Sequence, residues 1–223
     1  MLDYQKYART FHLPWSLGIS SDDKVLKSVA HFRGKEVVVT EKMDGENTTC
    51  YFDHVHAKSI DSKGHWSRDR MKRLWATSIA PFLADEPAIH RICGENLVAV
   101  HSIEYSAMAA HFYAFNAWYK TNMSLAWDDL VLLCDVIGIP HAPVLYRGSW
   151  DEKVIRSLYP RESALGGEQE GYVVANANSF HFDDFKTNVA KFVRFNHVQT
   201  DEHWMFQAPK ENIIALPNQT PES

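Results

Sequence analysis

The chain has 223 residues, of which 45% are hydrophobic and 23% charged, a composition typical of a globular protein and unlike that of a disordered one. A net charge of −5 excludes a generic nucleic-acid coat protein, since such proteins are basic. No apolar run reaches the roughly 18 residues of a membrane span, and the polar first ten residues predict no signal peptide. Three cysteines without a C-x-x-C pair favour a reducing, cytoplasmic location.

The basic residues are nevertheless concentrated in one segment. Residues 58–73 carry six basic side chains against two acidic ones: Lys58, Lys63, Arg68, Arg70, Lys72 and Arg73 against Asp61 and Asp69. A local phosphate-binding surface is therefore compatible with the acidic total.

The predicted elements of the first half begin with a short helix, capped by Ser20 or Ser21 and ending near residue 31. A β-branched strand follows over residues 37–43, and Asp44-Gly45 predicts a hairpin turn into a return strand over 48–52. Ser67 opens a helix whose apolar residues have helical spacing: Met71, Leu74, Trp75, Ile79 and Phe82. Strands are expected over 91–100 and 111–119.

The second half begins with a helix from Ser124 to about Ile137, closed by Gly138. Residues 149–152 form a capping box that opens another helix, and Gly166-Gly167 predicts a turn before strands over 172–175 and 189–195. Because helices and strands do not alternate regularly, the pattern predicts an α+β fold with antiparallel sheets. We expect one domain over 1–210, a polar tail over 211–223 and no separate C-terminal domain.

The segment Glu41-Lys42-Met43-Asp44-Gly45-Glu46-Asn47 carries the sharpest chemical signal. The side-chain period of a strand places Lys42 and Asp44 on one face, at the mouth of a predicted tight turn. A lysine held on a rigid strand end is a candidate nucleophile. The alternative is an exposed lysine beside a hairpin.

Four further motifs carry charged or aromatic residues in apolar surroundings. Glu170-Gly171 precedes a strand, and Glu95 follows Gly94 between apolar flanks. Lys191 lies in an apolar strand, where a charge needs a partner such as a phosphate. The aromatic strand Phe112-Tyr113-Ala114-Phe115 could stack on a purine. Taken singly, each has an ordinary reading: an edge glutamate, a snorkelling lysine or a core strand.

The order of these motifs resembles the covalent nucleotidyltransferase superfamily of DNA ligases, RNA ligases and mRNA capping enzymes. The finer resemblance is to RNA ligases of the phage and bacterial type, through Asn47 five residues after the lysine, the aromatic strand, and the opening Phe11-His12-Leu13-Pro14-Trp15-Ser16. It implies an ATP-grasp-like nucleotidyltransferase fold, with antiparallel sheets flanked by helices and an ATP cleft between them.

The resemblance also implies an ATP-dependent RNA ligase that uses Mg²⁺ or Mn²⁺. Lys42 would attack the α-phosphate of ATP, and the AMP would pass to an RNA 5′-phosphate before a 3′-hydroxyl seals the strand. An amine attacks only when neutral, and lysine normally titrates near 10.4. Asp44 and Glu41 would raise that pKa if they were close and unscreened, so we expect divalent cations and Lys191 to outweigh them.

The resemblance assigns further roles by position. Glu95 would contact the ribose and Phe115 (or Phe112) the adenine. Asp44 would sit in the nucleotide pocket with Glu41 and Met43, and Asn47 would support sealing. Glu170 would hold the metal, with Asp44 as a second ligand. Lys191 would bind the α-phosphate, while the RNA and its phosphates would meet Arg68, Lys58 and Arg194.

The chain departs from the superfamily at its last motif, which is commonly K-x-K. Here Lys191 and Arg194 are three residues apart and face opposite ways in a regular strand, so either a bulge turns Arg194 round or it pairs with a carboxylate. Many of these ligases add a C-terminal domain that grips the duplex or the incoming ends, so a protein partner, a homo-oligomer or the basic segment over residues 58–73 could supply missing end-binding surface. The alternatives are a DNA ligase, a capping-type enzyme, and a non-catalytic nucleotide- or RNA-binding relative.

Overall fold

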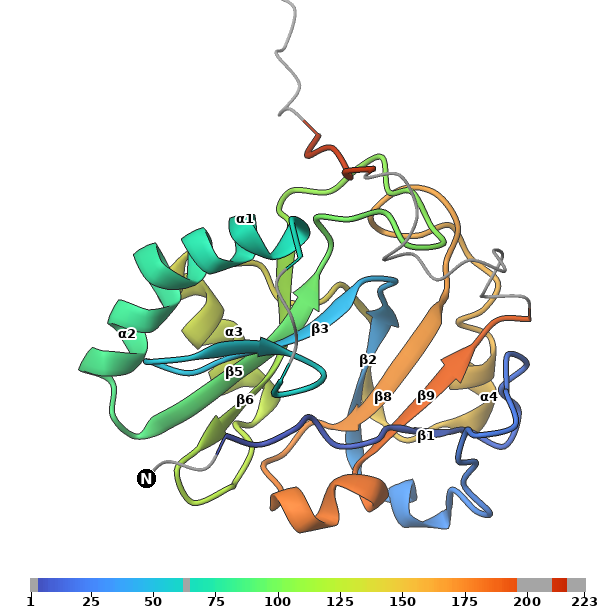
Figure 1. Cartoon of the computed structure of the whole chain (residues 1–223). Coiled ribbons are helices and arrows are strands. Elements are labelled where there is room, and N and C mark those ends of the chain that lie inside the picture. The colour runs from blue at the N-terminus through green and yellow to red at the C-terminus, as the bar shows by residue number, and fades with distance from the viewer. Residues whose placement is uncertain (1–3, 62–64, 196–209, 216–223) are drawn as a thin grey trace, which may run out of the picture.

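The computed structural model describes residues 4–61, 65–195 and 210–215. Two β-sheets lie beside each other (Figure 1). The first sheet has the order β1 (Phe11–His12), β9 (Val189–Val193), β8 (Gly171–Asn176), β2 (Glu36–Lys42) and β7 (Val144–Ser149). The second has the order β4 (Val55–Ala57), β3 (Glu46–Cys50), β5 (Ile89–Asn96) and β6 (Phe112–Tyr119). All neighbours are antiparallel except β1 and β9, which confirms the predicted α+β class.

The helices cover the sheets and close the core. α1 (Ser67–Leu74), a π-helical segment (Trp75–Ile79) and α2 (Ala80–Asp85) form one continuous helix. This helix and α3 (Trp127–Ile137) share a hydrophobic cluster with the second sheet. α4 (Glu152–Arg156) packs its Ile155 against β2 and β8 of the first sheet. Short 3₁₀ helices lie at Ala30–Phe32 and Phe182–Thr187. No helix in the described part of the chain is long and apolar enough to cross a membrane.

The predicted hairpin at Asp44-Gly45 is wrong, because β2 and β3 belong to different sheets. β2 is buried on both faces and pairs with β7 and β8, whereas β3 pairs with β4 and β5. Gly45 is needed for another reason: a Cβ there would lie 2.6 Å from the carbonyl oxygen of Asn96. The chain thus crosses between sheets directly after Lys42, in close contact with β5.

The predicted helix over residues 20–31 is also wrong, apart from the 3₁₀ turn at Ala30–Phe32. The backbone around residue 25 pairs instead with the segment that contains β1: His12 N–H donates to Lys24 O, and Leu26 N–H donates to His12 O. Ser20 donates its hydroxyl to Asp23, which closes a local turn. Backbone groups used in this way cannot enter a helical ladder.

The helix predicted from Ser67 is confirmed, and its π-helical segment has a local cause. Pro81 lies in the first turn of α2, and proline has no N–H to donate to the carbonyl four residues before it. Ala80 N–H donates to Trp75 O, a π-type bond. The helix continues through the proline because the ladder shifts by one residue.

Other boundaries differ from the predicted ones. α3 begins at Trp127 rather than Ser124, because the backbone of Ser124 forms an antiparallel β-bridge with Trp118. α4 is capped by Asp151, whose carboxylate accepts the N–H groups of Lys153 and Val154, so the capping box at 149–152 is wrong. β7 was not predicted, since its side chains are exposed or half-buried and give no alternating apolar pattern.

The predicted tail begins inside the fold rather than outside it. Asn212 is 1% exposed. Its Nδ2 donates to Leu97 O at 2.9 Å, and its Oδ1 accepts Tyr105 N–H at 3.1 Å. Its own backbone N–H donates to Val98 O. The described residues 210–215 are therefore anchored on the loop that connects β5 and β6, while residues 216–223 lie outside the described residues.

Candidate active site

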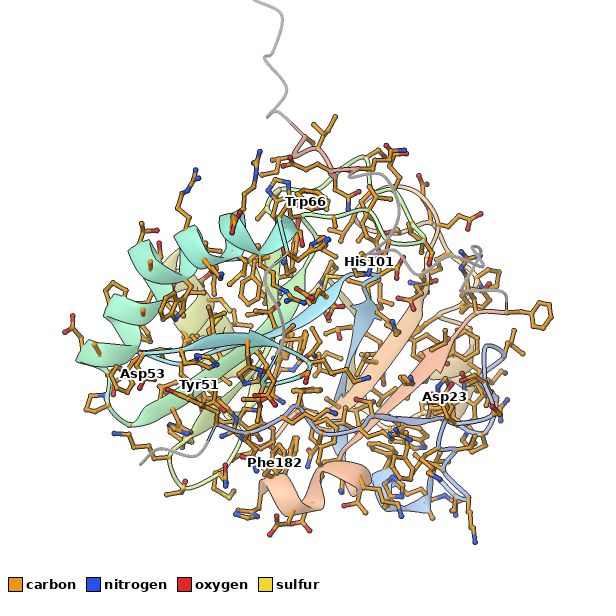
Figure 2. The ribbon with its side chains drawn as sticks, in the orientation of Figure 1. Asp23, Tyr51, Asp53, Trp66, His101 and Phe182 are labelled. Atoms are coloured by element: carbon orange, nitrogen blue, oxygen red, sulfur yellow. The ribbon has the colours of Figure 1, made fainter. Side chains whose placement is uncertain are left out.

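A pocket of about 680 Å³ lies between the two sheets. From the first sheet it is lined by β2, β8 and β9, and from the second by β3, β5 and β6. The N-terminal segment and the loop after β5 complete it, and Figure 2 labels Asp23 and His101, one from each of these parts. The cleft between sheets that the resemblance implied is thus present.

The chemistry of the wall changes along β2. Lys42 is the last residue of the strand. Thr40 and Val38, two and four residues before it, also line the pocket. On β8, Val173 and Ala175 pair with Thr40 and Val38. The pocket therefore has a polar end at Lys42 and an apolar end about four residues, or roughly 13 Å, farther along the strand.

Lys42 is held in an ion pair at the polar end. Its Nζ lies 2.5 Å from both carboxylate oxygens of Glu170, which is 3% exposed and precedes β8. Gly171 lets this strand approach β9, since a Cβ there would lie 2.0 Å from Phe192 O. The glycine after Glu170 therefore serves sheet packing rather than ligand approach.

The surroundings of Lys42 favour its protonated form. Burial alone would lower the pKa of Lys42, but the carboxylates of Glu170, Glu95 and Asp44 outweigh burial and raise it. Glu41 is not among the groups responsible, because its carboxylate turns away to accept hydrogen bonds from Ser163 Oγ and Ala164 N–H. Bonded in this way, Glu41 does not meet the condition of lying close to Lys42 and unscreened.

The two glutamates beside Lys42 resist ionisation. Burial, followed by repulsion from Glu170 and Asp44, raises the pKa of Glu95 to about 8 against the attraction of Lys42. Burial and the charge of Asp44 raise the pKa of Glu170 to about 7, again against Lys42. The polar end thus has more carboxylate than one lysine can neutralise, and it favours the binding of added positive charge.

Neither Asp44 nor Glu170 is among the residues that line the pocket, but Asp44 is also engaged in hydrogen bonds. Its Oδ2 accepts the backbone N–H groups of Ser102 at 2.6 Å and Ile103 at 2.8 Å, and its own N–H donates to Tyr105 Oη. The carboxylate therefore ties the crossing after Lys42 to the loop after β5. This bonding makes Asp44 a weaker candidate for metal binding than Glu170.

Lys191 lines the pocket from β9, as predicted. Burial and the charge of Lys42 lower its pKa, against the opposing charges of Asp23 and Glu170. Asp23 Oδ1 lies 3.7 Å from Lys191 Nζ and 3.2 Å from His12 Nε2. The sequence did not identify Asp23 as a site residue, because it lies in the segment that was predicted to form the first turn of a helix.

The aromatic strand β6 places Phe115, not Phe112, in the pocket wall. Phe112 is 1% exposed and packs in the main core. Phe115 stands in a β-bulge, because Cys93 pairs with Asn116 and Gly94 pairs with Ala114. Tyr7 contacts Phe115 edge to face, with ring centroids 5.3 Å apart, and also lines the pocket.

The three basic residues assigned to RNA separate into two groups. Lys58 and Arg68 line the pocket, and Arg68 Nε donates to Glu46 Oε2 at 2.8 Å in a two-pronged ion pair. Arg194 does not line it: its NH2 lies 3.0 Å from Glu168 Oε2. The pairing of Arg194 with a carboxylate, rather than a bulge that turns it into the cleft, is the arrangement observed.

A model of the RNA ligase family matches residues 35–193 of the chain. The chain belongs to the RNA ligase family. A comparison with curated protein sequences finds no match. Among solved structures, an archaeal ATP-dependent RNA ligase is similar, with a TM-score of 0.55 and 18% identity over 86% of this chain and 48% of that one. Naegleria gruberi RNA ligase gives 0.54 and 16% over 74% and 51%.

A variant of the Naegleria gruberi enzyme solved with ATP and manganese is also similar, with a TM-score of 0.51 and 16% identity over 74% of this chain and 52% of that one. At these identities the likeness shows the fold, which is that of nucleotidyltransferases. The chain spans about half the length of these ligases.

The polar end of the pocket has side chains that could share a divalent cation with a substrate. The described residues contain no cluster of three or more histidine, cysteine or acidic side chains arranged for a metal ion. Magnesium, however, is usually bound by one or two carboxylates together with substrate phosphates. Glu170, buried and with a raised pKa beside two further carboxylates, fits such a shared site.

Proposed function

We propose that this chain is an ATP-dependent RNA ligase, which joins RNA 3′-hydroxyl and 5′-phosphate ends through an AMP bound covalently to Lys42. One observation carries the proposal: in a chain of the RNA ligase family, Lys42 ends a central strand at the polar end of an interior pocket and faces Glu170. An exposed lysine beside a turn would have no such surroundings.

In the first step, Lys42 Nζ attacks the α-phosphorus of ATP. A nitrogen–phosphorus bond forms, the bond to pyrophosphate breaks, and the amine gives up its proton. Because Glu170, Glu95 and Asp44 raise the pKa of Lys42 in the free protein, the lysine reacts only after this negative charge is offset. Lys191, which lines the pocket on β9, brings a positive charge to the α-phosphate.

Glu170 would hold the magnesium or manganese ion. When bound, that ion neutralises charge on the departing pyrophosphate. A cation held by Glu170 would share that carboxylate with Lys42 and would weaken the ion pair that keeps the lysine protonated.

The family resemblance implies roles for five further residues, and the position of each in the pocket lining supports them. Glu95, on β5 beside Lys42, would contact the ribose, and Phe115 would stack on the base. In the later steps the AMP passes from Lys42 to an RNA 5′-phosphate, and a 3′-hydroxyl attacks that phosphate and releases AMP. Asn47 would support these steps, while Lys58 and Arg68 would contact RNA phosphates at the outer part of the pocket.

Incubation of the protein with α-³²P-labelled ATP and Mg²⁺ or Mn²⁺ tests the first step. We expect a radioactive protein band that Lys42→Ala abolishes and that Lys153→Ala, at an exposed lysine of α4, leaves unchanged. The absence of wild-type labelling with any nucleoside triphosphate would contradict the proposal.

Substrate panels separate the alternatives. Competition by GTP distinguishes a capping-type enzyme, and nicked duplexes with DNA or RNA on the 3′-hydroxyl side distinguish DNA from RNA ligation. RNA binding without AMP transfer would instead indicate a non-catalytic relative. We propose in addition that a protein partner or a second copy of the chain contributes end-binding surface. Light scattering with and without 5′-phosphorylated RNA tests the second copy.

A further inference from the structure

The apolar end of the pocket contains one polar side chain with an unused hydrogen-bonding atom. Asn116, on β6, lines the pocket. Its Oδ1 is buried and has no hydrogen-bond partner. Buried polar atoms in folded proteins are nearly always paired with protein groups or water, so an unpaired oxygen on a pocket wall leaves an acceptor that a bound ligand can use.

The β-bulge explains why Asn116 faces the pocket together with its neighbour. Successive residues of a regular strand point to opposite sides. Here Phe115 is the extra residue of the bulge, because its neighbours Ala114 and Asn116 pair with consecutive residues of β5. Bulges re-aim side chains in this way, so an aromatic ring and a carboxamide both reach the same cavity.

The strand register places Asn116 away from the reacting end. Asn47 pairs with Glu95, and Thr49 pairs with Cys93, which in turn pairs with Asn116. The row that contains Asn116 therefore lies two residues, or roughly 7 Å, beyond the row of Glu95. Since Glu95 is close enough to Lys42 to raise its pKa, the order along the pocket is Lys42, Glu95, Asn116.

The surroundings of Asn116 are apolar. Ala117, the next residue, accepts the backbone N–H of Leu125, and Trp127 shares a hydrophobic cluster with Ala117 and Val38. Trp127 and Val38 both line the pocket. An apolar wall that carries the carboxamide of Asn116 suits a heteroaromatic base with a hydrogen-bond donor at its edge, whereas Asn47, the other carboxamide of the pocket, pairs with Glu95 nearer to Lys42.

We propose that Asn116 recognises the base by accepting a hydrogen bond from the 6-amino group of adenine. This inference rests on the proposed function, and it adds the residue that recognises the base. The carboxamide oxygen is the acceptor. A substrate without the amino group leaves this oxygen buried and unpaired, which penalises that substrate.

A comparison of ATP with GTP would be a poor test, since a rotated carboxamide can donate its NH₂ to the 6-oxygen of guanine. Purine riboside 5′-triphosphate, which has hydrogen at position 6, removes the donor without adding an acceptor. The measured quantity is the apparent second-order rate constant for formation of the covalent protein–nucleotide adduct, determined for each triphosphate separately. The ratio of the two rates within one variant does not depend on the fraction of folded protein.

We expect wild-type protein to favour ATP over purine riboside triphosphate by on the order of tenfold. Asn116→Leu, which is similar in size and has no acceptor, should bring the ratio close to one. Asn116→Asp retains an acceptor and should retain a preference for ATP. Asn178→Leu makes the same chemical change at an exposed asparagine outside the pocket and should keep the wild-type ratio.

Two results would overturn the inference alone: equal wild-type rates with both nucleotides, or an unchanged ratio in Asn116→Leu. Failure of the wild-type protein to form an adduct with any nucleotide would instead overturn the proposed function, and the inference with it. The two failures are therefore distinguishable in one experiment.

Discussion

Lys42 Nζ contacts both carboxylate oxygens of Glu170 at 2.5 Å, across 128 positions of sequence. The pair joins the end of β2 to the start of β8, two neighbouring strands of the first sheet. It holds Lys42, the proposed nucleophile, in place and raises its pKa in the free protein.

Glu170→Gln should lower the pKa of Lys42 in the nucleotide-free and metal-free protein. The substitution removes the strongest of the charges that raise it and leaves burial, which acts in the opposite direction. The pH dependence of acetylation at Lys42, measured by peptide mass spectrometry, should shift to lower pH. Lys153 provides an internal control, and an unchanged profile at Lys42 would show that Glu170 does not set its protonation.

Glu95→Gln should stabilise the metal-free protein at high pH. The pKa of Glu95 is raised from 4.5 to about 8 in the folded chain, so the folded state holds more protons than the unfolded state between these values. Stability is therefore lost as the pH rises through this window. The variant lacks this loss, and its melting temperature should exceed that of wild type by a few degrees at pH 9 and match it near pH 4.5.

The matched control for this measurement is Glu86→Gln, at an exposed glutamate after α2. It should give the same pH dependence as wild type. A Glu95→Gln variant that is less stable than wild type at pH 9 would contradict the assigned burial cost of that carboxylate.

Asn212→Ala should destabilise the fold and slow formation of the protein–AMP adduct. The side chain bridges Leu97 O and Tyr105 N–H, and its loss leaves buried backbone groups unpaired at a cost of about 1–3 kcal/mol. The same loop binds Asp44 through Ser102 and Ile103. Urea denaturation and ATP labelling measure the two effects, and Ile213→Ala, at a 77% exposed residue, should change neither.

Arg194→Ala should leave the KM for ATP unchanged, because Arg194 pairs with Glu168 outside the pocket. Arg68→Ala, in contrast, removes a cation from the pocket wall and should slow the sealing of 5′-phosphorylated RNA. Steady-state kinetics on both substrates separate these effects. An increase in KM for ATP in the Arg194 variant would show that Arg194 binds phosphate, as its position in the K-x-K-like motif suggested.

The order of the motifs identified the family. It also predicted that Lys42, Glu95, Phe115 and Lys191 belong to one site, and all four line the pocket. These residues could be predicted because each lies on a strand with a clear sequence pattern. The sheet to which each strand belongs was not readable in the same way. Asp44-Gly45 has the composition of a hairpin turn, yet Gly45 is required by contact with Asn96 O, a residue about fifty positions away. The composition of a turn indicates its local conformation. It does not indicate whether the strands on either side of the turn pair with each other.

Asp23 and Asn212 were missed for a related reason. Asp23 contacts His12 and Lys191, and Asn212 bonds to a loop more than a hundred residues before it. Asp23 lies in a segment that was predicted to be a helix, and Asn212 lies in the predicted tail. Neither segment carries a functional motif, so only tertiary contacts identify these two residues. The bulge at Phe115 is likewise a property of pairing with β5, and a regular strand would have turned Asn116 away from Phe115.

Peptide mapping after incubation with ATP and magnesium shows which residue carries AMP. We expect one AMP attached through nitrogen to Lys42, we expect added pyrophosphate to remove it, and we expect 5′-phosphorylated RNA to remove it as well. Adduct on another lysine, or none on Lys42 while the protein remains folded, would contradict the proposed role of Lys42.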